Sequence, residues 1–261
     1  MTMIQEGLVG VFDILGYQNI IDNNDIEKIF KIVSEKLNNL PKNVKDTIEK
    51  LIQDKETRNY FIKEMKNFSW LVISDTILLT LPFDPNISSS DRVLNWIYFL
   101  LLSAMLLRLS FDEGLPLRGA VDLGNFFIDG NCFAGKPIVG AYRFANNLQI
   151  SGCALTTNVK KVLEKDLDNV SAELRDNIIN HLLFMYLVPL KDGKEEKLLI
   201  VNWLKPLDDW EKTPDDIRQY VVDKFHAHNK DVHRKAFVKL ENTEIILRYS
   251  LNRNRILDNL H

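Results

Sequence analysis

Short, strongly apolar runs alternate along the chain with longer stretches in which apolar residues recur at helical spacing. Residues 8–14, LVGVFDI, form a short apolar run with an acid near its end, a pattern typical of a central strand whose charge lies where the strand emerges. Residues 68–81, FSWLVISDTILLTL, predict two strands joined at the polar pair Ser74–Asp75. Further strands are predicted over residues 117–125, 154–157 and 198–203.

Helices are predicted between these strands. Asp25 is placed to cap a helix whose apolar positions recur from Ile26 to Leu37, and Pro41 is predicted to end it. Other predicted helices span residues 44–66, 92–111, 138–148 and 172–183. After Pro206 the chain carries many charges and no glycine, which predicts two further helices over residues 215–238 and 241–259.

The most apolar stretch, residues 96–107, is about half the length that a membrane span needs, so we predict a buried helix and no membrane contact. Residues 1–10 contain Glu6 and no basic region, and so do not resemble a signal peptide. The two cysteines, Cys132 and Cys153, fit a reducing compartment. These observations together predict a cytoplasmic protein.

The order of the elements predicts an α+β fold, with helices on one face of a mostly antiparallel sheet. The chain has 261 residues, which we divide into a domain over residues 1–205 and a C-terminal helical extension over residues 206–261. The formal net charge of −3 gives no electrostatic reason to expect a nucleic acid or an anionic membrane as a partner.

Asp13 and Asp75 are the strongest candidates for chemistry, because each lies where an apolar run meets a turn. A carboxylate there is costly to bury and is expected to face a cleft or a partner. Two carboxylates on neighbouring strands suit divalent cations such as Mg²⁺, which take oxygen ligands from one or two carboxylates and from substrate phosphates. The alternative is that both residues are helix caps or turn formers.

Residues 12–17, FDILGY, place Asp13 just before a glycine that can open a helix, and backbone N–H groups at such a turn bind phosphate. The chain contains neither GxxxxGK[ST] nor GxGxxG, so the common nucleotide-binding loops are not expected.

These segments resemble class III nucleotide cyclases. Residues 12–17 resemble the first metal motif of that family, and Ser74–Asp75 resembles the second. Residues 117–124, LRGAVDLG, resemble the strand that follows, and residues 133–143 resemble the segment that leads to a catalytic arginine, here Arg143. The resemblance runs in order over residues 8–160. It is closest to the pyrimidine cyclases of bacterial Pycsar anti-phage defence, whose cyclic UMP or cyclic CMP activates a separate effector.

The resemblance implies a ferredoxin-like core, a homodimer with shared active sites, and specific residue roles. Asp13, Asp75 and the backbone carbonyl of Ile14 are expected to bind two Mn²⁺ or Mg²⁺ ions. Arg143 is expected to neutralise charge on the α-phosphate across the dimer interface. The residues expected to bind substrate are Phe12, Leu15, Gly16, Tyr17, Tyr60 and Cys132, with the N–H groups of Leu15, Gly16 and Tyr17 on the β- and γ-phosphates.

Three positions leave alternatives open. Tyr60 either contacts the base or packs in the fold, Cys132 either reads the base or is a small buried side chain, and Arg118 either pairs with an acid or touches the triphosphate.

Two departures from the family pattern bear on the substrate. Leu71 stands where purine cyclases carry a Lys or Glu that reads the base, which favours a pyrimidine, and the family favours UTP over CTP. Val139 stands where the family usually has Asn, which favours the alternative of a catalytically inactive nucleotide-binding dimer.

Overall fold

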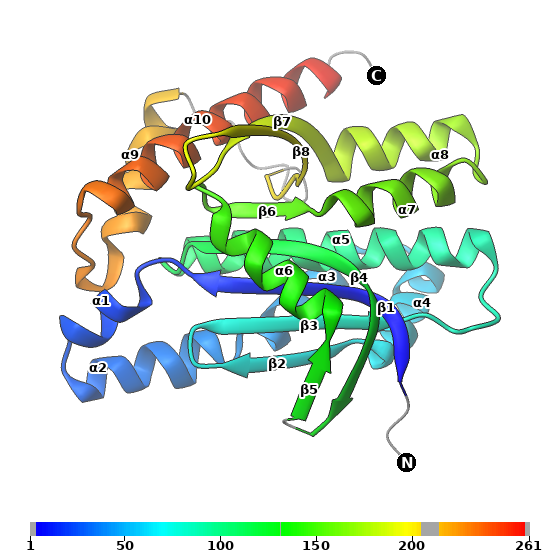
Figure 1. The fold of residues 1–261 in the computed structure, drawn as a ribbon, viewed down its shortest axis with the longest axis horizontal. Coiled ribbons are helices and arrows are strands. Elements are labelled where there is room, and N and C mark those ends of the chain that lie inside the picture. The colour runs from blue at the N-terminus through cyan, green and yellow to red at the C-terminus, as the bar shows by residue number, and fades with distance from the viewer. Residues whose placement is uncertain (1–3, 131, 205–213, 259–261) are drawn as a thin grey trace.

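The computed structural model describes residues 4–130, 132–204 and 214–258. Its centre is a sheet with the strand order β2-β3-β1-β4-β6-β8-β7, to which β5 adds by pairing with β4 (Figure 1). All of these pairings are antiparallel except that between β4 and β6. The strands are β1 Gln5–Ile14, β2 Ser69–Ile73, β3 Thr76–Pro82, β4 Leu117–Asp129, β5 Cys132–Gly135, β6 Gly152–Leu155, β7 Leu183–Pro189 and β8 Glu195–Val201.

The helices lie on both faces of this sheet. In Figure 1 α6 crosses in front of the strands, whereas α3, α4 and α5 lie behind them. The α-helices are α1 Tyr17–Asp22, α2 Ile26–Phe30, α3 Leu40–Leu51, α4 Lys55–Glu64, α5 Ser89–Asp112, α6 Lys136–Asn147, α7 Thr157–Leu167, α8 Ala172–Asn177, α9 Pro214–His226 and α10 Arg234–Asp258. The predicted fold class is confirmed, with most helices on one face and α6 on the other.

The two sides of β1 belong to different hydrophobic clusters. Leu8, Phe12 and Ile14 pack into the large core behind the sheet. Val9 and Val11 pack into a smaller cluster with α6. Because side chains alternate along a strand, Asp13 falls on the α6 face, at the end of β1.

The apolar helix α5 is the centre of the large core. Trp96 and Phe99 are fully buried, and the Trp96 indole N–H donates to the Asp166 carboxylate at 2.8 Å. By length and composition alone α5 could cross a membrane, but 78% of its most apolar window is buried inside the protein. The prediction of a buried helix is confirmed.

Several sequence predictions were wrong in detail. Pro41 does not end a helix but lies in the first turn of α3, where a missing N–H costs nothing. Neither α7 nor β7 was predicted. Two helices were predicted over 215–238 and 241–259, and the structure has α9 and α10, but the helices are interrupted at residues 227–233 and not at 239–240, which lie inside α10. His228 and Asn229 adopt positive φ at this interruption.

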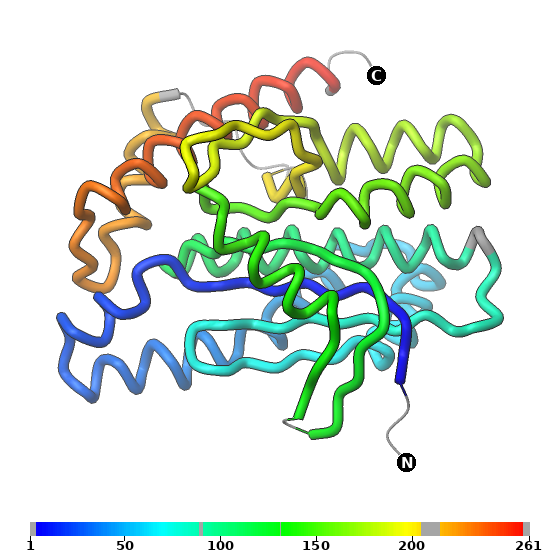
Figure 2. The backbone as a smooth tube through the Cα atoms, in the orientation of Figure 1, coloured from blue at the N-terminus to red at the C-terminus, as the bar shows by residue number. Residues whose placement is uncertain are grey.

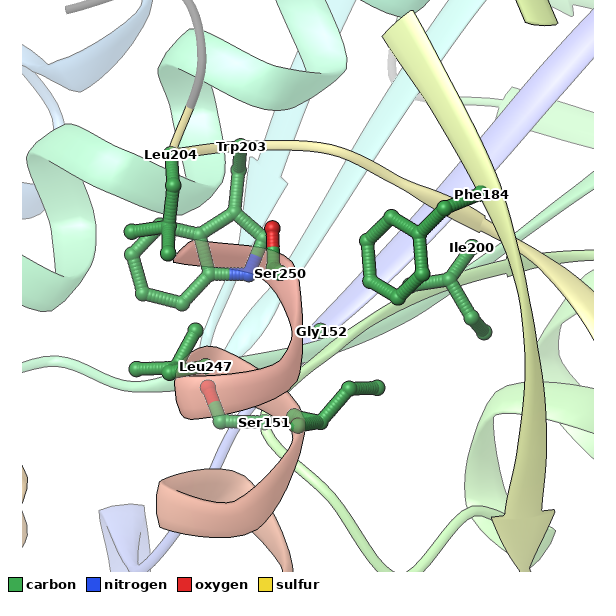
Figure 3. Close-up of a pocket in the computed structure, with 9 residues that line it drawn as sticks. Ser151, Gly152, Phe184, Ile200, Trp203, Leu204, Leu247 and Ser250 are labelled. Atoms are coloured by element: carbon green, nitrogen blue, oxygen red, sulfur yellow. The ribbon is translucent and has the colours of Figure 1, made fainter. Parts of the chain in front are cut away.

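The helix α10 packs directly on the sheet. Ser151, Phe184 and Trp203 meet Leu247 and Ser250 of α10 around a cavity of about 10 Å³ (Figure 3), which has room for no more than one water molecule. The predicted domain boundary after residue 205 lies outside the described residues and stays a prediction.

Candidate active site

The two predicted metal-binding aspartates meet at one end of the sheet. Ser74, with φ 55°, turns the chain between β2 and β3, and Asp75 follows it. The Ile14 N–H donates to the Asp75 carbonyl at 2.9 Å, and Asp13 pairs in register with Thr76. Asp13, at the end of β1, and Asp75, in the turn before β3, are therefore close neighbours.

Asp13 is half-buried, and its surroundings only partly compensate its charge. Burial raises the pKa of Asp13, the adjacent Arg118 lowers it, and the negative charge of Asp75 raises it again, with a net upward shift. The Arg118 guanidinium donates to Asp13 Oδ2 at 2.8 Å. Burial is the largest cause of this shift, so the ionised form of Asp13 is only partly compensated within the chain, and a divalent cation beside it would favour that form.

The donor set fits a hard divalent cation completed by substrate. Asp13, Asp75 and the Ile14 carbonyl offer only oxygen ligands, as Mg²⁺ and Mn²⁺ prefer. Within the described ranges, no group of three or more His, Cys, Asp or Glu side chains is placed to hold a metal ion. A site with two carboxylates matches cations that take their remaining ligands from phosphate and water.

Arg118 is held rigidly at the start of β4. It is 5% exposed, lies opposite Asp13 in register, and donates to the Asn146 side-chain oxygen at 2.5 Å and to the Asn146 carbonyl at 3.2 Å. Its Nε is buried without a hydrogen-bond partner among the described residues. Asn146 thus belongs to the site as the residue that positions Arg118.

The glycine turn after β1 has the predicted geometry. Gly16 has φ +78°, which favours glycine, and a Cβ there would lie 3.1 Å from the Lys230 stem, which would have to shift slightly. The prediction for Leu15 needs correction, because its N–H already donates to the Pro116 carbonyl at 2.9 Å and is not available to a phosphate.

Phe12 also needs correction as a residue that contacts substrate. Its side chain is fully buried in the core behind the sheet, on the face opposite Asp13. A Cβ at Gly119 would lie 2.4 Å from the Phe12 ring, so the two residues fit each other across the strands.

Within one chain, Tyr60 and Cys132 lie away from Asp13, so the structure does not bring these predicted substrate-binding residues to the candidate site. Tyr60 lies on α4 behind the sheet, with its ring 6.1 Å from that of Tyr98 on α5. Cys132 is exposed and pairs with Asp129, at the opposite end of β4 from Arg118.

A groove of about 420 Å³ begins at the metal-site hairpin and runs beside α6. Asp75 lines it together with Ile73, Val139 and Tyr142. These three apolar side chains are 43%, 48% and 49% exposed. Arg143 lies next to Tyr142 on α6 and is exposed, and no described residue forms an ion pair or hydrogen bond with it.

No family model matches this sequence, and no curated protein matches it. The fold is similar to the adenylyl cyclase CyaB from P. aeruginosa, with 12% identity, 82% of this chain and 99% of that chain covered, and a TM-score of 0.45. It is also similar to the guanylate cyclase domain of RhGC from Catenaria anguillulae, solved in complex with GTP, with 13% identity, coverage of 76% and 97%, and a TM-score of 0.43.

A third similar structure is the monomeric guanylyl cyclase domain of the RhoGC fusion protein from the aquatic fungus Blastocladiella emersonii, with 11% identity, coverage of 77% and 96%, and a TM-score of 0.44. These values describe a distant likeness of fold.

Sequence reasoning missed one basic residue near Asp13. Lys191 lies in the turn between β7 and β8, and its N–H donates to the Asn147 carbonyl at 2.8 Å. Burial, then the positive charge of Arg118, lowers the pKa of Lys191, while Asp13 raises it. Recognition of β7 would have revealed this hairpin, because LKDG is a turn sequence between two apolar runs.

Proposed function

We propose that this chain is a metal-dependent nucleotide cyclase that converts UTP into 3′,5′-cyclic UMP and pyrophosphate. The observation that carries the proposal is the placement of Asp13, at the end of β1, next to Asp75, in the β2–β3 turn, close to the Gly16 turn. In the reaction, the ribose 3′-oxygen loses its proton and bonds to the α-phosphorus. The bond from that phosphorus to the bridging oxygen breaks, and pyrophosphate leaves with the electron pair.

Asp13, Asp75 and the Ile14 carbonyl would hold two Mn²⁺ or Mg²⁺ ions, which when bound make the 3′-hydroxyl more acidic and neutralise phosphate charge. Arg118 donates to Asp13 Oδ2 at 2.8 Å and so orients this carboxylate, and its positive charge would favour a bound triphosphate. The N–H groups of Gly16 and Tyr17 would bind the β- and γ-phosphates.

The proposal includes a homodimer, because the groove beside α6 leaves apolar side chains exposed next to Asp75. A second copy of the chain that covers Val139 and Tyr142 would bring Arg143 of the partner subunit toward the α-phosphate. An arginine at that point stabilises the charge that develops in phosphoryl transfer.

The choice of a pyrimidine rests on the resemblance and on Leu71. Leu71 lies on β2 and packs against the smaller cluster near α6, where an apolar side chain offers no hydrogen bond to a purine edge. The proposed preference for UTP over CTP is based on the Pycsar resemblance. The proposed cytoplasmic location and role in anti-phage defence have the same basis. Tyr60 and Cys132 are left out of the base site of the same chain.

A second candidate is a catalytically inactive dimer that binds a nucleotide. Val139 favours it, because an exposed valine in the groove replaces the asparagine that the family usually has there. The intact pair Asp13 and Asp75 favours the enzyme.

The test is incubation of the protein with each of ATP, GTP, CTP and UTP and Mn²⁺, followed by chromatography. We expect cyclic UMP and an equal amount of pyrophosphate from UTP. Cyclic CMP as the main product would show that the substrate is CTP and not UTP, with the same type of reaction. No product from any of the four, with a folded dimer that binds UTP, would favour the inactive alternative.

A mixing experiment tests the shared site. Asp75→Ala and Arg143→Ala chains are each expected to be inactive, but a mixture contains heterodimers with one intact site. Random pairing restores roughly a quarter of the wild-type activity in a two-fold dimer. No recovery, with subunit exchange verified, would contradict the role of Arg143 across the interface.

A further inference from the structure

The C-terminal helix α10 brings two lysines toward the proposed active site. Lys235 and Lys239 are separated by one helical turn, and Thr243 follows one turn later. Residues four apart share one face of a helix. The Thr243 hydroxyl donates to the Lys239 carbonyl at 2.6 Å, which confirms that these two residues lie one above the other.

The face of α10 that carries these residues is the one that docks on the rest of the protein. Thr243 is fully buried, and its hydroxyl oxygen accepts the Ser151 N–H at 2.8 Å. The Ser151 hydroxyl in turn donates to the carbonyl of Leu117, the residue before Arg118. The lysine face of α10 is therefore tied by a short chain of hydrogen bonds to the strand end that holds Arg118.

The segment from Asn146 to Ser151 forms hydrogen bonds with three neighbouring elements, β4, the β7–β8 turn and α10. Arg118 bonds to Asn146, the Lys191 N–H bonds to the Asn147 carbonyl, and the Asn242 side-chain amide of α10 donates to the Gln149 carbonyl at 3.0 Å. Lys191, Val238 and Asn242 also line one hollow between the β7–β8 turn and α10, which run side by side in Figure 2. Three separate elements thus converge on this end of the sheet.

We call Arg118, Lys191, Lys235 and Lys239 the cation cluster. Lys239 is half-buried, and burial, followed by the charges of Arg118 and Lys191, lowers its pKa. Lys235 adds to that lowering, and Asp13 opposes it. Within the described residues, Asp13 is the only carboxylate that forms an ion pair with a member of the cluster, and it pairs with Arg118.

We propose that the cation cluster binds the terminal phosphates of the substrate, so that α10 is part of the active site and supplies Lys239 to it. The identity of the ligand as a nucleoside triphosphate rests on the proposed function, whereas the affinity of the cluster for a polyphosphate anion does not. Four cations beside the two carboxylates Asp13 and Asp75 leave a local excess of positive charge that a di- or triphosphate group neutralises.

The binding test uses inorganic tripolyphosphate as the probe, titrated calorimetrically into the full chain in metal-free buffer. We expect Lys239→Gln to weaken tripolyphosphate binding roughly tenfold, the lower range for loss of a hydrogen bond to a charged group. Lys239→Arg keeps the charge and is expected to restore most of the affinity. Lys161→Gln removes the same charge from an exposed position on α7 and is expected to change nothing.

The kinetic test separates this inference from the cyclase itself. In turnover of UTP, Lys239→Gln is expected to raise KM roughly tenfold and to change kcat much less, because the lost contact is made to both ground state and transition state. Tripolyphosphate binding and KM equal to wild type in Lys239→Gln would overturn the role of α10. Absence of turnover in the wild type, with binding that still depends on Lys239, would overturn the cyclase proposal and keep the cluster as a polyphosphate site.

Discussion

The two faces of the sheet are built in different ways. Behind it, α3 and α5 cover a large core in which Trp96 and Phe99 are fully buried. In front of it, α6 covers a small cluster, and Ile73, Val139 and Tyr142 at its groove are close to half exposed. One face is complete within a single chain, whereas the other leaves apolar surface uncovered.

This difference indicates that the residues that stabilise the fold and the residues of the candidate site lie on opposite faces of the sheet. Asp13 and Arg118 follow the alternation of β1 and β4 onto the α6 face, next to the uncovered surface. Phe12 and Gly119, one position away, point into the complete core. A single step along each strand therefore divides residues that stabilise the fold from residues that are free to bind a ligand.

The largest effect is expected from a change in the complete face. Phe99→Ala removes a fully buried ring from α5 and is expected to lower the free energy of unfolding by about 3–5 kcal/mol. Urea denaturation measures this change. Val139→Ala on the open face serves as the matched truncation, with an expected change within about 0.5 kcal/mol. Equal losses in the two variants would contradict the division between the faces.

Asp75→Asn is expected to have the next largest effect, on activity and not on stability. The backbone carbonyl of residue 75 still accepts the Ile14 N–H, so the hairpin is retained. Loss of a metal ligand is expected to lower turnover by at least about 100-fold, beyond the range for outer-shell partners of metal ligands. Turnover of each triphosphate with Mn²⁺ measures it.

Asp176→Asn, at an exposed position on α8, makes the same chemical change away from the site and is the control. Full activity in Asp75→Asn would remove the metal assignment. A large loss in Asp176→Asn would show that the assay reports general damage and not the site.

The sequence was sufficient to predict the core of the site. An apolar run that ends in an acid fixed Asp13 at a strand end, and the polar joint in residues 68–81 fixed Asp75 at a hairpin. Pairing of β1 with β3 then brought the two together. These inferences succeeded because strand alternation and turn residues are local signals that the chain carries by itself.

The rest of the site depends on contacts that local patterns do not encode. Phe12 is the exception, because strand alternation alone directs it to the face opposite Asp13, and its assignment to the substrate came from the resemblance. The Leu15 N–H donates to the carbonyl of Pro116, which is about a hundred residues away in sequence. Lys239 lies on the docked face of α10 because Thr243 packs on Ser151, and neither Thr243 nor Ser151 carries a signal for that contact in the sequence.

A charge introduced into the groove is expected to act on assembly. Val139→Glu places a carboxylate on the exposed apolar surface beside Tyr142, where burial in a dimer would desolvate it. The dissociation constant of the dimer is expected to rise at least about tenfold, as for a central interface residue. Sedimentation velocity measures it, and unfolding of the monomer is expected to change by less than about 0.5 kcal/mol.

Lys136→Glu, at an exposed position at the start of α6, introduces the same carboxylate on the same helix outside the groove lining. Its dimerisation is expected to match the wild type. A wild-type protein that sediments as a monomer at all concentrations, or a Val139→Glu variant that dimerises normally, would contradict the proposed interface.

The smallest expected effect is the titration of Asp13, which reports the charge balance of the open face directly. Burial and the charge of Asp75 raise its pKa above the ordinary value of 3.8, despite the pairing with Arg118. Because the folded state then holds the proton more tightly than the unfolded state, Asp13 makes metal-free protein more stable as pH falls through the raised pKa. Protons and cations compete for the same oxygens, so metal binding weakens over that range.

The carboxyl ¹³C shift of Asp13 measures this titration by NMR. The midpoint is expected above 3.8 in the metal-free wild type. It is expected to be lower than this in Asp75→Asn, because a like charge is removed, and the addition of Mg²⁺ to the wild type is also expected to lower it. A midpoint that does not move in Asp75→Asn would show that the two carboxylates do not interact. In that case the assignment of the two aspartates to one metal site would be wrong, although Asp13 still lies at the end of β1 and Asp75 in the neighbouring β2–β3 turn.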